Sequence, residues 1–176
     1  MNTMIEIREI TEENQQDLNL KNDPFEMLGR LIPSLKDGVW DYRVEKFQSV
    51  GSMCFPDENY DFRQYAKDGL ILGAYEDGKC LGIGIFQDTC RKYLYLLDLK
   101  VSSCARRKGI GKLLINAGMA RAKTRGYRGL YLHAQDNNLN ACLFYLACGF
   151  EIGGFDNYIY NGTGQEGKAD IIFYKQ

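Results

Sequence analysis

The sequence predicts one mixed α/β domain, of the three-layer or the α+β kind, over residues 1–176. Its length is close to the ~150 residues of a usual domain, and a hydrophobic fraction of 45% is sufficient for one core. Segments that resemble antiparallel strands come first along the chain. A strand–helix–strand–helix–strand order follows them, which is typical of α/β and α+β folds.

The first half of the chain is predicted to consist mainly of strands. Apolar alternation or β-type composition predicts strands at residues 5–10, 39–47, 70–75 and 80–87. The last two flank Asp77-Gly78, which predicts a hairpin. Helical spacing of Phe25, Leu28 and Ile32 predicts a helix that Pro33 ends. A loop or a short helix is predicted at residues 51–68.

The second half is predicted to alternate strands and helices. Tyr93–Val101 is a long apolar run, typical of a strand covered on both faces. Gly82 and Gly84, in an earlier strand, leave room for another backbone or a ligand. A helix is predicted at Ile110–Lys123, with an apolar stripe of Leu113, Leu114, Ala117 and Ala120. The last predicted elements are a strand at 130–134, a helix at 138–148 that Gly149 ends, and strands at 150–160 and 170–174.

Charge is distributed unevenly along the chain. The net charge is −1, yet residues 99–135 hold nine Lys and Arg and no Asp or Glu. This favours a polyanion bound at one place, although a solvated helix face would give the same pattern. Nucleic acid is not expected, because the protein as a whole is not basic.

Other exclusions follow from composition. No apolar run reaches the ~18 residues needed to cross a bilayer, and Met1–Ile10 has no apolar leader segment. We therefore expect a cytoplasmic protein without a membrane partner. The six cysteines form no C-x-x-C pair and are expected to be reduced. The single histidine, His133, excludes a multi-histidine metal site, and no metal is expected.

A phosphate-binding loop is predicted between the apolar strand and the basic helix. Its sequence is Arg106-Arg107-Lys108-Gly109-Ile110-Gly111-Lys112. Glycines allow a tight turn, and the start of a helix offers unpaired N–H groups and the positive end of the dipole. The spacing fits neither a Walker A loop nor a Rossmann fingerprint. A plain basic turn before a helix remains the alternative.

Two motifs resemble those of the GNAT superfamily of N-acyltransferases. The first is Arg106-x-x-Gly109-x-Gly111 after the apolar strand, and the second is Asn138-x-x-Ala141-x-x-x-Tyr145-x-x-x-Gly149-Phe150. The resemblance implies a three-layer domain with a mixed, mostly antiparallel central sheet that is splayed at the acyl-CoA site. It also implies an acetyl-CoA-dependent N-acetyltransferase, with acetyl-CoA as co-substrate.

The same resemblance implies roles for individual residues. Tyr145 would donate a proton to the CoA thiolate, for which an ordinary pKa of about 10 is suitable. A packing role is the alternative for Tyr145, and a plain helix N-cap is the alternative for Asn138. The residues implied in cofactor binding are Leu99, Val101, Arg106, Arg107, Lys108, Gly109, Ile110, Gly111, Lys112, Asn138 and Tyr145.

The base and the substrate contacts are less closely defined. Asp98 can orient the amine or take its proton, and His133 has a suitable ordinary pKa of about 6.5. Asp136 and Asp156 are further candidates for attracting a cation. Cys104, Cys142 and Cys148 lack a recognisable paired base, so direct transfer is favoured over an acyl-enzyme.

Further segments resemble the streptothricin acetyltransferases. They are Pro24-Phe25-Glu26, Leu28-Gly29-Arg30, Ile32-Pro33, Gln135-Asp136-Asn137-Asn138 and Tyr158-Ile159-Tyr160. The resemblance implies a small cationic amine as substrate, and antibiotic resistance as the role. Leu97 and His133 depart from it, because acids are expected there. Acetylation of a protein N-terminus or lysine, and an acyl-CoA-binding module without turnover, are the alternatives, and a homodimer is left open.

Overall fold

The structure is a computed structural model that describes residues 4–176. The chain divides into two units, which are described separately. The first unit runs up to Asp23 and continues over Cys54–Leu130, and the second consists of Pro24–Met53 and Tyr131–Gln176. The first three residues of Met1–Ile10, where no leader is expected, lie outside the described residues. The single domain expected from the sequence stays a prediction.

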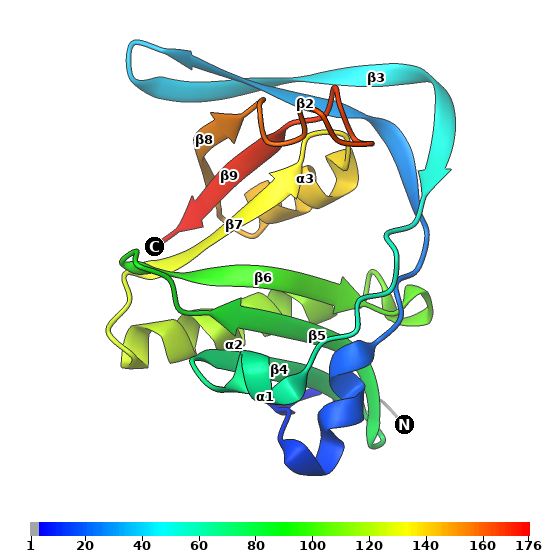
Figure 1. The fold of residues 1–176 in the computed structure, drawn as a ribbon, viewed down its shortest axis with the longest axis vertical. Coiled ribbons are helices and arrows are strands. Elements are labelled where there is room, and N and C mark those ends of the chain that lie inside the picture. Colours follow the sequence, from blue (N-terminus) through cyan, green and yellow to red (C-terminus); the bar gives the residue numbers. More distant parts are fainter. Residues whose placement is uncertain (1–3) are drawn as a thin grey trace. The chain divides into compact units, whose positions relative to one another are not determined.

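The first unit contains four strands in the order β1–β4–β5–β6, of which β4, β5 and β6 are labelled in Figure 1. They are β1 (Glu6–Glu9), β4 (Gly69–Glu76), β5 (Lys79–Gln87) and β6 (Tyr93–Val101), and each neighbouring pair is antiparallel. Asp77 and Gly78 join β4 to β5 with φ values of 51° and 78°. Positive φ at both positions is typical of a type I′ turn, so the predicted hairpin is confirmed.

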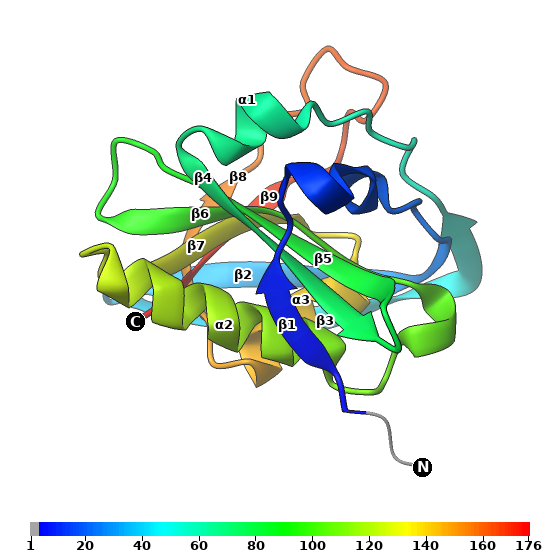
Figure 2. The ribbon, with the colours of Figure 1, turned by 90° about the horizontal axis from the view of Figure 1, so that it is seen from below.

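Helices cover both faces of these strands (Figure 2). The 3₁₀ helix η1 (Glu12–Asn19) and the short helix α1 (Phe62–Ala66) lie on one face, and α2 (Ile110–Thr124) lies on the other. The short 3₁₀ turn η2 (Ser103–Ala105) links β6 to α2. A core cluster with Leu18, Ile83 and Ile85 lies on the η1 and α1 side. Helix η1 has no counterpart among the predicted elements, because seven of its eight residues are polar or charged.

One expectation about α2 needs correction. The helix buries Ile110, Leu114, Ile115, Gly118, Met119 and Ala122, whereas Leu113 is 40% exposed. The buried face is therefore rotated from the predicted stripe toward Ile115 and Met119, and it includes Gly118. A Cβ on Gly118 would lie 2.2 Å from the Phe86 ring. A Cβ on Gly82 would lie 2.9 Å from the backbone oxygen of Lys100 and 3.1 Å from Ile110, so another backbone does approach this glycine closely.

The second unit contains the strands β7 (Gly129–Gln135), β9 (Asp170–Lys175) and β8 (Glu151–Asp156), in that order. The first two residues of β7 belong to the first unit. Helix α3 (Leu139–Ala147) begins at an Asn138 side chain that accepts from Ala141 N at 3.3 Å. Gly149 follows it with φ 84°, as predicted. Strand β8 is shorter than predicted, because the Asp156 carboxylate accepts from Tyr158 N and Ile159 N and forms a turn.

The helix predicted before Pro33 is wrong. Strands β2 (Phe25–Lys36) and β3 (Val39–Met53) form a long antiparallel hairpin instead (Figure 1). Asp37 and Gly38 make its turn with φ values of 51° and 77°. Both strands of a two-stranded ribbon are edges, so Pro33 is tolerated. A Cβ on Gly29 would lie 2.2 Å from Glu45 O, which explains a glycine at this close approach.

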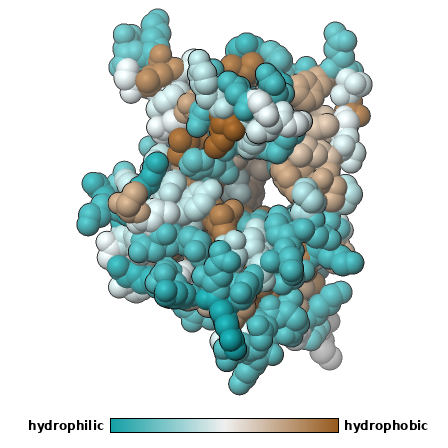
Figure 3. All heavy atoms as spheres, in the orientation of Figure 1, coloured by the Kyte–Doolittle hydropathy of each residue, from teal (hydrophilic) through white to brown (hydrophobic). Residues whose placement is uncertain are grey.

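The surface of the molecule differs between these regions. In the view of Figure 3, the face of the first unit is mainly hydrophilic, and apolar atoms are exposed near the turn of the hairpin. Leu35 and Val39 beside that turn are 57% and 67% exposed. Within residues 4–176, no helix is both long enough and apolar enough to span a membrane.

Candidate active site

The predicted phosphate loop lies in the first unit, between β6 and α2. Arg107 and Gly109 have φ values of 66° and 79°, and these two left-handed positions turn the chain into the helix. The first intrahelical bond runs from Leu113 N to Gly109 O at 3.1 Å. The amides of residues 110–112 therefore have no partner within the helix. The first turn of α2, all of which is described, carries no acid, which is compatible with the predicted anion site.

The two glycines of the loop have different roles. Gly109 is the N-cap in the left-handed conformation, whereas Gly111 lies inside α2. Only Gly109 therefore provides the tight turn that the sequence predicts for both. A β-branched residue is strongly disfavoured at a φ of 79°. The loop therefore requires a residue without a side chain at position 109.

Two basic side chains of the loop contact the protein itself. The Arg106 guanidinium donates to Val101 O and to Asp23 O, each at 3.4 Å. Lys108 Nζ lies 3.6 Å from a carboxylate oxygen of Glu76. Arg106 therefore holds the loop against its neighbours through backbone carbonyls. Direct contacts of these side chains with phosphate remain predictions.

Asp23 holds the same loop from the other side. Its Oδ2 accepts from Ser103 N at 2.7 Å, at the start of η2. We expect Asp23→Ala to raise the KM for acetyl-CoA by roughly threefold to tenfold, because one hydrogen bond contributes ~0.5–1.5 kcal/mol. Asp23→Asn keeps an acceptor oxygen and should stay within about twofold of the wild type. Steady-state kinetics at a saturating amine concentration measure this, and an alanine variant with unchanged KM would contradict it.

Asp98 lies on the opposite face of β6 from Leu99 and Val101. These two residues pair with Gly84 and Gly82 of β5, which carry no side chains. An irregularity in the pairing makes Leu97 an extra residue of β6. A β-bulge of this kind changes the direction of neighbouring side chains. Leu97 consequently packs against the core cluster on the η1 side.

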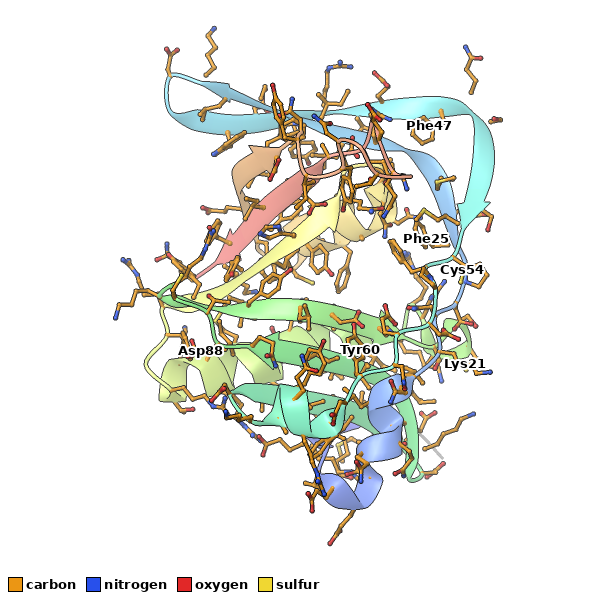
Figure 4. The ribbon with its side chains drawn as sticks, in the orientation of Figure 1. Lys21, Phe25, Phe47, Cys54, Tyr60 and Asp88 are labelled. Atoms are coloured by element: carbon orange, nitrogen blue, oxygen red, sulfur yellow. The ribbon has the colours of Figure 1, made fainter. Side chains whose placement is uncertain are left out.

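The Asp98 carboxylate belongs to a charged cluster of four residues. Tyr60 Oη donates to its Oδ2 at 3.0 Å, and Lys100 Nζ lies 3.4 Å from the same oxygen. Lys100 also forms an ion pair with Glu58. Figure 4 shows Tyr60 against strands β5 and β6. Burial raises the pKa of the Asp98 carboxyl above its ordinary value, whereas the Lys100 charge lowers it.

The remaining candidates lie in the second unit. The ring of Tyr145 packs against Phe150 and Phe173, with centroids 5.7 and 6.0 Å apart. The buried Asp136 accepts from Ala169 N at 3.1 Å and lies 3.7 Å from Arg30. His133 Nδ1 lies 3.6 Å from Asp170 Oδ2. Asp136 and Asp156 therefore both have structural partners, and their substrate contacts remain predictions.

A buried polar network near His133 was not foreseen as a unit. Tyr160 Oη donates to Asp170 at 2.7 Å, and Gln135 Nε2 donates to Tyr160 Oη at 3.0 Å. Burial, together with Asp170, raises the pKa of Tyr160 to about 12. Within the described part of the chain, Gln135 Oε1 and Asn137 Oδ1 are buried without a hydrogen-bond partner. Segments resembling streptothricin acetyltransferases supply Gln135, Asn137 and Tyr160.

The sequence-predicted residues divide between the two units. The first holds Asp98, the β6 end and the phosphate loop, and the second holds His133, Asp136, Asn138, Tyr145 and Asp156. Reasoning from the sequence missed Glu58, Tyr60 and Lys100 as partners of Asp98. The spacing of Asp98 and Lys100 in an apolar strand was the available signal, because residues two apart share a face. No local pattern marks Glu58 or Tyr60.

The cysteines differ in burial, and this affects their reactivity. Burial raises the pKa of the Cys142 thiol to about 12, which makes it a poor nucleophile. Cys148 is also buried, and Cys104 is exposed. No three His, Cys, Asp or Glu side chains gather as metal ligands within residues 4–176.

A tight, glycine-containing turn between an antiparallel sheet and a helix without acids in its first turn is the arrangement expected of the acyl-CoA transferases that the motifs resemble. The profile of the Acetyltransferase (GNAT) family matches residues 36–150. The chain therefore belongs to the GNAT family, and it is an acetyl-CoA-dependent N-acetyltransferase. The mixed, mostly antiparallel fold class predicted from the sequence is confirmed.

Particular relatives were also found. Streptothricin acetyltransferase A of Bacillus subtilis (strain 168) is 30% identical over 169 residues, which cover 96% of this chain and 98% of that protein. A Bacillus anthracis (strain Ames) protein assigned as a streptothricin acetyltransferase, and crystallised with acetyl coenzyme A, superposes with a TM-score of 0.86. It is 29% identical, with 97% of each chain covered. A nourseothricin acetyltransferase, 20% identical over 97% and 96% of the chains, shares the fold with a TM-score of 0.80.

Proposed function

We propose that this enzyme transfers acetyl from acetyl-CoA directly to a primary amine of a small cationic molecule of the streptothricin type, and so confers antibiotic resistance. The observation that carries the acceptor class is the similarity to streptothricin acetyltransferase A over nearly the full length of both chains. Antibiotics of this type carry basic amines. The Asp98 carboxylate, which is 17% exposed, supports a cationic acceptor.

The phosphate loop supports a binding site for acetyl-CoA at the start of α2. Its diphosphate would be bound by the amides of residues 110–112 and by the positive end of the α2 dipole. The chain-turning Gly109 makes these amides available. The backbone of Leu99 and Val101 would pair with the pantetheine arm, opposite the side-chain-free Gly82 and Gly84. The side chains of Arg106, Arg107, Lys108 and Lys112 would add positive charge.

The reaction forms a C–N bond and breaks a C–S bond. The neutral amine nitrogen attacks the thioester carbonyl carbon, a C–N bond forms, and the C–S bond breaks. The amine loses a proton to Asp98, directly or through water. Tyr145 gives a proton to the departing thiolate. Holding both reactants in place supplies much of the rate by proximity, so no acyl-enzyme is required.

An acceptor panel tests this function. Release of free CoA thiol from acetyl-CoA should be fastest with streptothricin, slower with polyamines such as spermidine, and at least about a hundredfold slower with lysine or N-terminal peptides. A rate ratio of this size is usual when the poorer substrate leaves several polar groups of the binding site without partners. Tyr145→Phe serves as the control for enzyme-dependent release. Fastest turnover with peptides would overturn the acceptor class, and binding of acetyl-CoA without turnover of any amine would overturn the enzyme.

Location and assembly are part of the same proposal. The six free thiols support a reducing cytoplasm as the place of action. A homodimer stays a prediction, and the exposed Leu35 and Val39 of the hairpin are its available apolar surface. Sedimentation equilibrium measures the assembly state.

A further inference from the structure

The cluster around Asp98 binds one of its two carboxylate oxygens much more firmly than the other. Tyr60 Oη and Lys100 Nζ both contact Oδ2, at 3.0 and 3.4 Å. Within residues 4–176, no hydrogen bond to Oδ1 is found. The side chain of Asp98 is 17% exposed, so it is confined but not sealed. The carboxylate is thus held through Oδ2, while Oδ1 keeps its capacity to accept from a further donor.

Lys100 is held in place by the rest of the cluster. Its side chain is only 8% exposed, and its ammonium donates to Leu20 O at 3.3 Å and forms an ion pair with Glu58. The Tyr60 ring lies 5.5 Å from the same ammonium. A buried ammonium needs such compensation, because desolvation disfavours an unpaired charge. Glu58 itself accepts from Asn22 Nδ2 at 2.8 Å, which fixes the outer end of the cluster.

We propose that Lys100 and Tyr60 are positioning residues, which hold Asp98 ionised and oriented so that its Oδ1 receives the proton of the acceptor amine, and that Glu58 opposes Lys100 in setting that ionisation. The inference rests on the proposed function, in which Asp98 takes that proton. It gives roles to Glu58, Tyr60 and Lys100, which belong neither to the phosphate loop nor to the second motif.

The charges fix the direction of each expected change. Burial raises the pKa of Asp98, and Glu58 adds to the rise, whereas Lys100 and the Tyr60 hydrogen bond lower it. Removing the cation should therefore make Asp98 harder to ionise, and removing the Glu58 charge should make it easier. Tyr60 itself stays protonated, because burial and Asp98 raise its pKa well above the ordinary value. It can therefore act only as a donor to Asp98.

The test follows Asp98 in two ways. Carboxyl ¹³C titration of ¹³C-aspartate-labelled protein reports its ionisation, and Asp98→Asn identifies the resonance by removing it. The pH dependence of kcat/KM for one amine at saturating acetyl-CoA reports its catalytic effect, because the acceptor's own titration is common to all variants. Lys100→Met, Lys100→Arg, Tyr60→Phe and Glu58→Gln are compared. Glu6→Gln, which removes a charge from exposed β1, is the matched control.

We expect Lys100→Met to move the Asp98 titration and the acidic limb of the rate profile up by about one pH unit or more, the usual effect of an adjacent opposite charge. Tyr60→Phe should move both upward by less. Glu58→Gln should move both downward, while Lys100→Arg and Glu6→Gln leave them near the wild type. The KM for acetyl-CoA should stay within about twofold in every variant.

Each outcome separates the inference from the proposed function. An Asp98 titration that does not move in Lys100→Met, or that moves upward in Glu58→Gln, overturns the positioning roles. If Lys100→Met fails to fold, the downward shift in Glu58→Gln still decides, because that variant keeps the buried cation. A titration that moves while the rate profile stays fixed supports the anchoring of Asp98 and overturns its role as proton acceptor.

Discussion

Gly109→Val should remove most of the affinity for acetyl-CoA. The residue has a φ of 79°, and a β-branched side chain is strained there by ~1–3 kcal/mol. If the loop changes its conformation to relieve this strain, the amides at the start of α2 no longer point toward the bound diphosphate. The dissociation constant measured by calorimetry should therefore rise roughly tenfold to a hundredfold.

A matched control lies at the other end of the same helix. Gly126 has a φ of 84°, and, as at Gly109, no atom of the described residues lies within 4 Å of its Cβ position. Gly126→Val therefore carries the same kind of backbone strain, outside the loop. It should lower thermal stability to a similar extent and leave binding close to the wild type. Equal losses of affinity in both variants would mean that general destabilisation, and not the loop, is responsible.

Tyr145→Phe is expected to lower kcat by roughly a hundredfold or more, the usual contribution of a general acid. Phenylalanine keeps the ring that packs against Phe150 and Phe173, so we expect the fold to be preserved. The KM for acetyl-CoA should change by less than about twofold, because the lost interaction acts in the transition state. Steady-state kinetics with the best amine of the panel measure both constants.

Tyr174→Phe provides the comparison for this variant. Tyr174 stacks on Tyr131 with centroids 5.7 Å apart, and it lies on β9 in the same unit. Loss of its hydroxyl tests whether removing any tyrosine oxygen of the unit slows turnover. A Tyr145→Phe enzyme with an unchanged kcat would assign Tyr145 to packing alone.

Local chemistry made much of the fold predictable. Asp77-Gly78 fixes a hairpin turn within two residues, and Asn138 and Gly149 mark both ends of α3. The hairpin of β2 and β3 was missed for a physical reason. Phe25, Leu28 and Ile32 have helical spacing, but the same stretch pairs with residues 39–53 along its length. Pairing between distant residues overrides a weak local preference.

The candidate site was predictable where the chemistry is local. The phosphate loop is a contiguous segment, so its backbone geometry follows from Gly109 and the start of α2. The partners of Asp98 were not predictable, because Tyr60 and Glu58 come from an irregular segment about forty residues away. A β-bulge at Leu97 also breaks the alternation on which face assignments depend.

The ion pair of Lys100 has a consequence for combined substitutions. Two acids and one base share a weakly hydrated place, so loss of the cation alone would leave two like charges facing each other. Substitutions at positions 58, 98 and 100 are therefore expected to be non-additive in their effects on the free energy of unfolding, because each one changes the charge that the other two residues face.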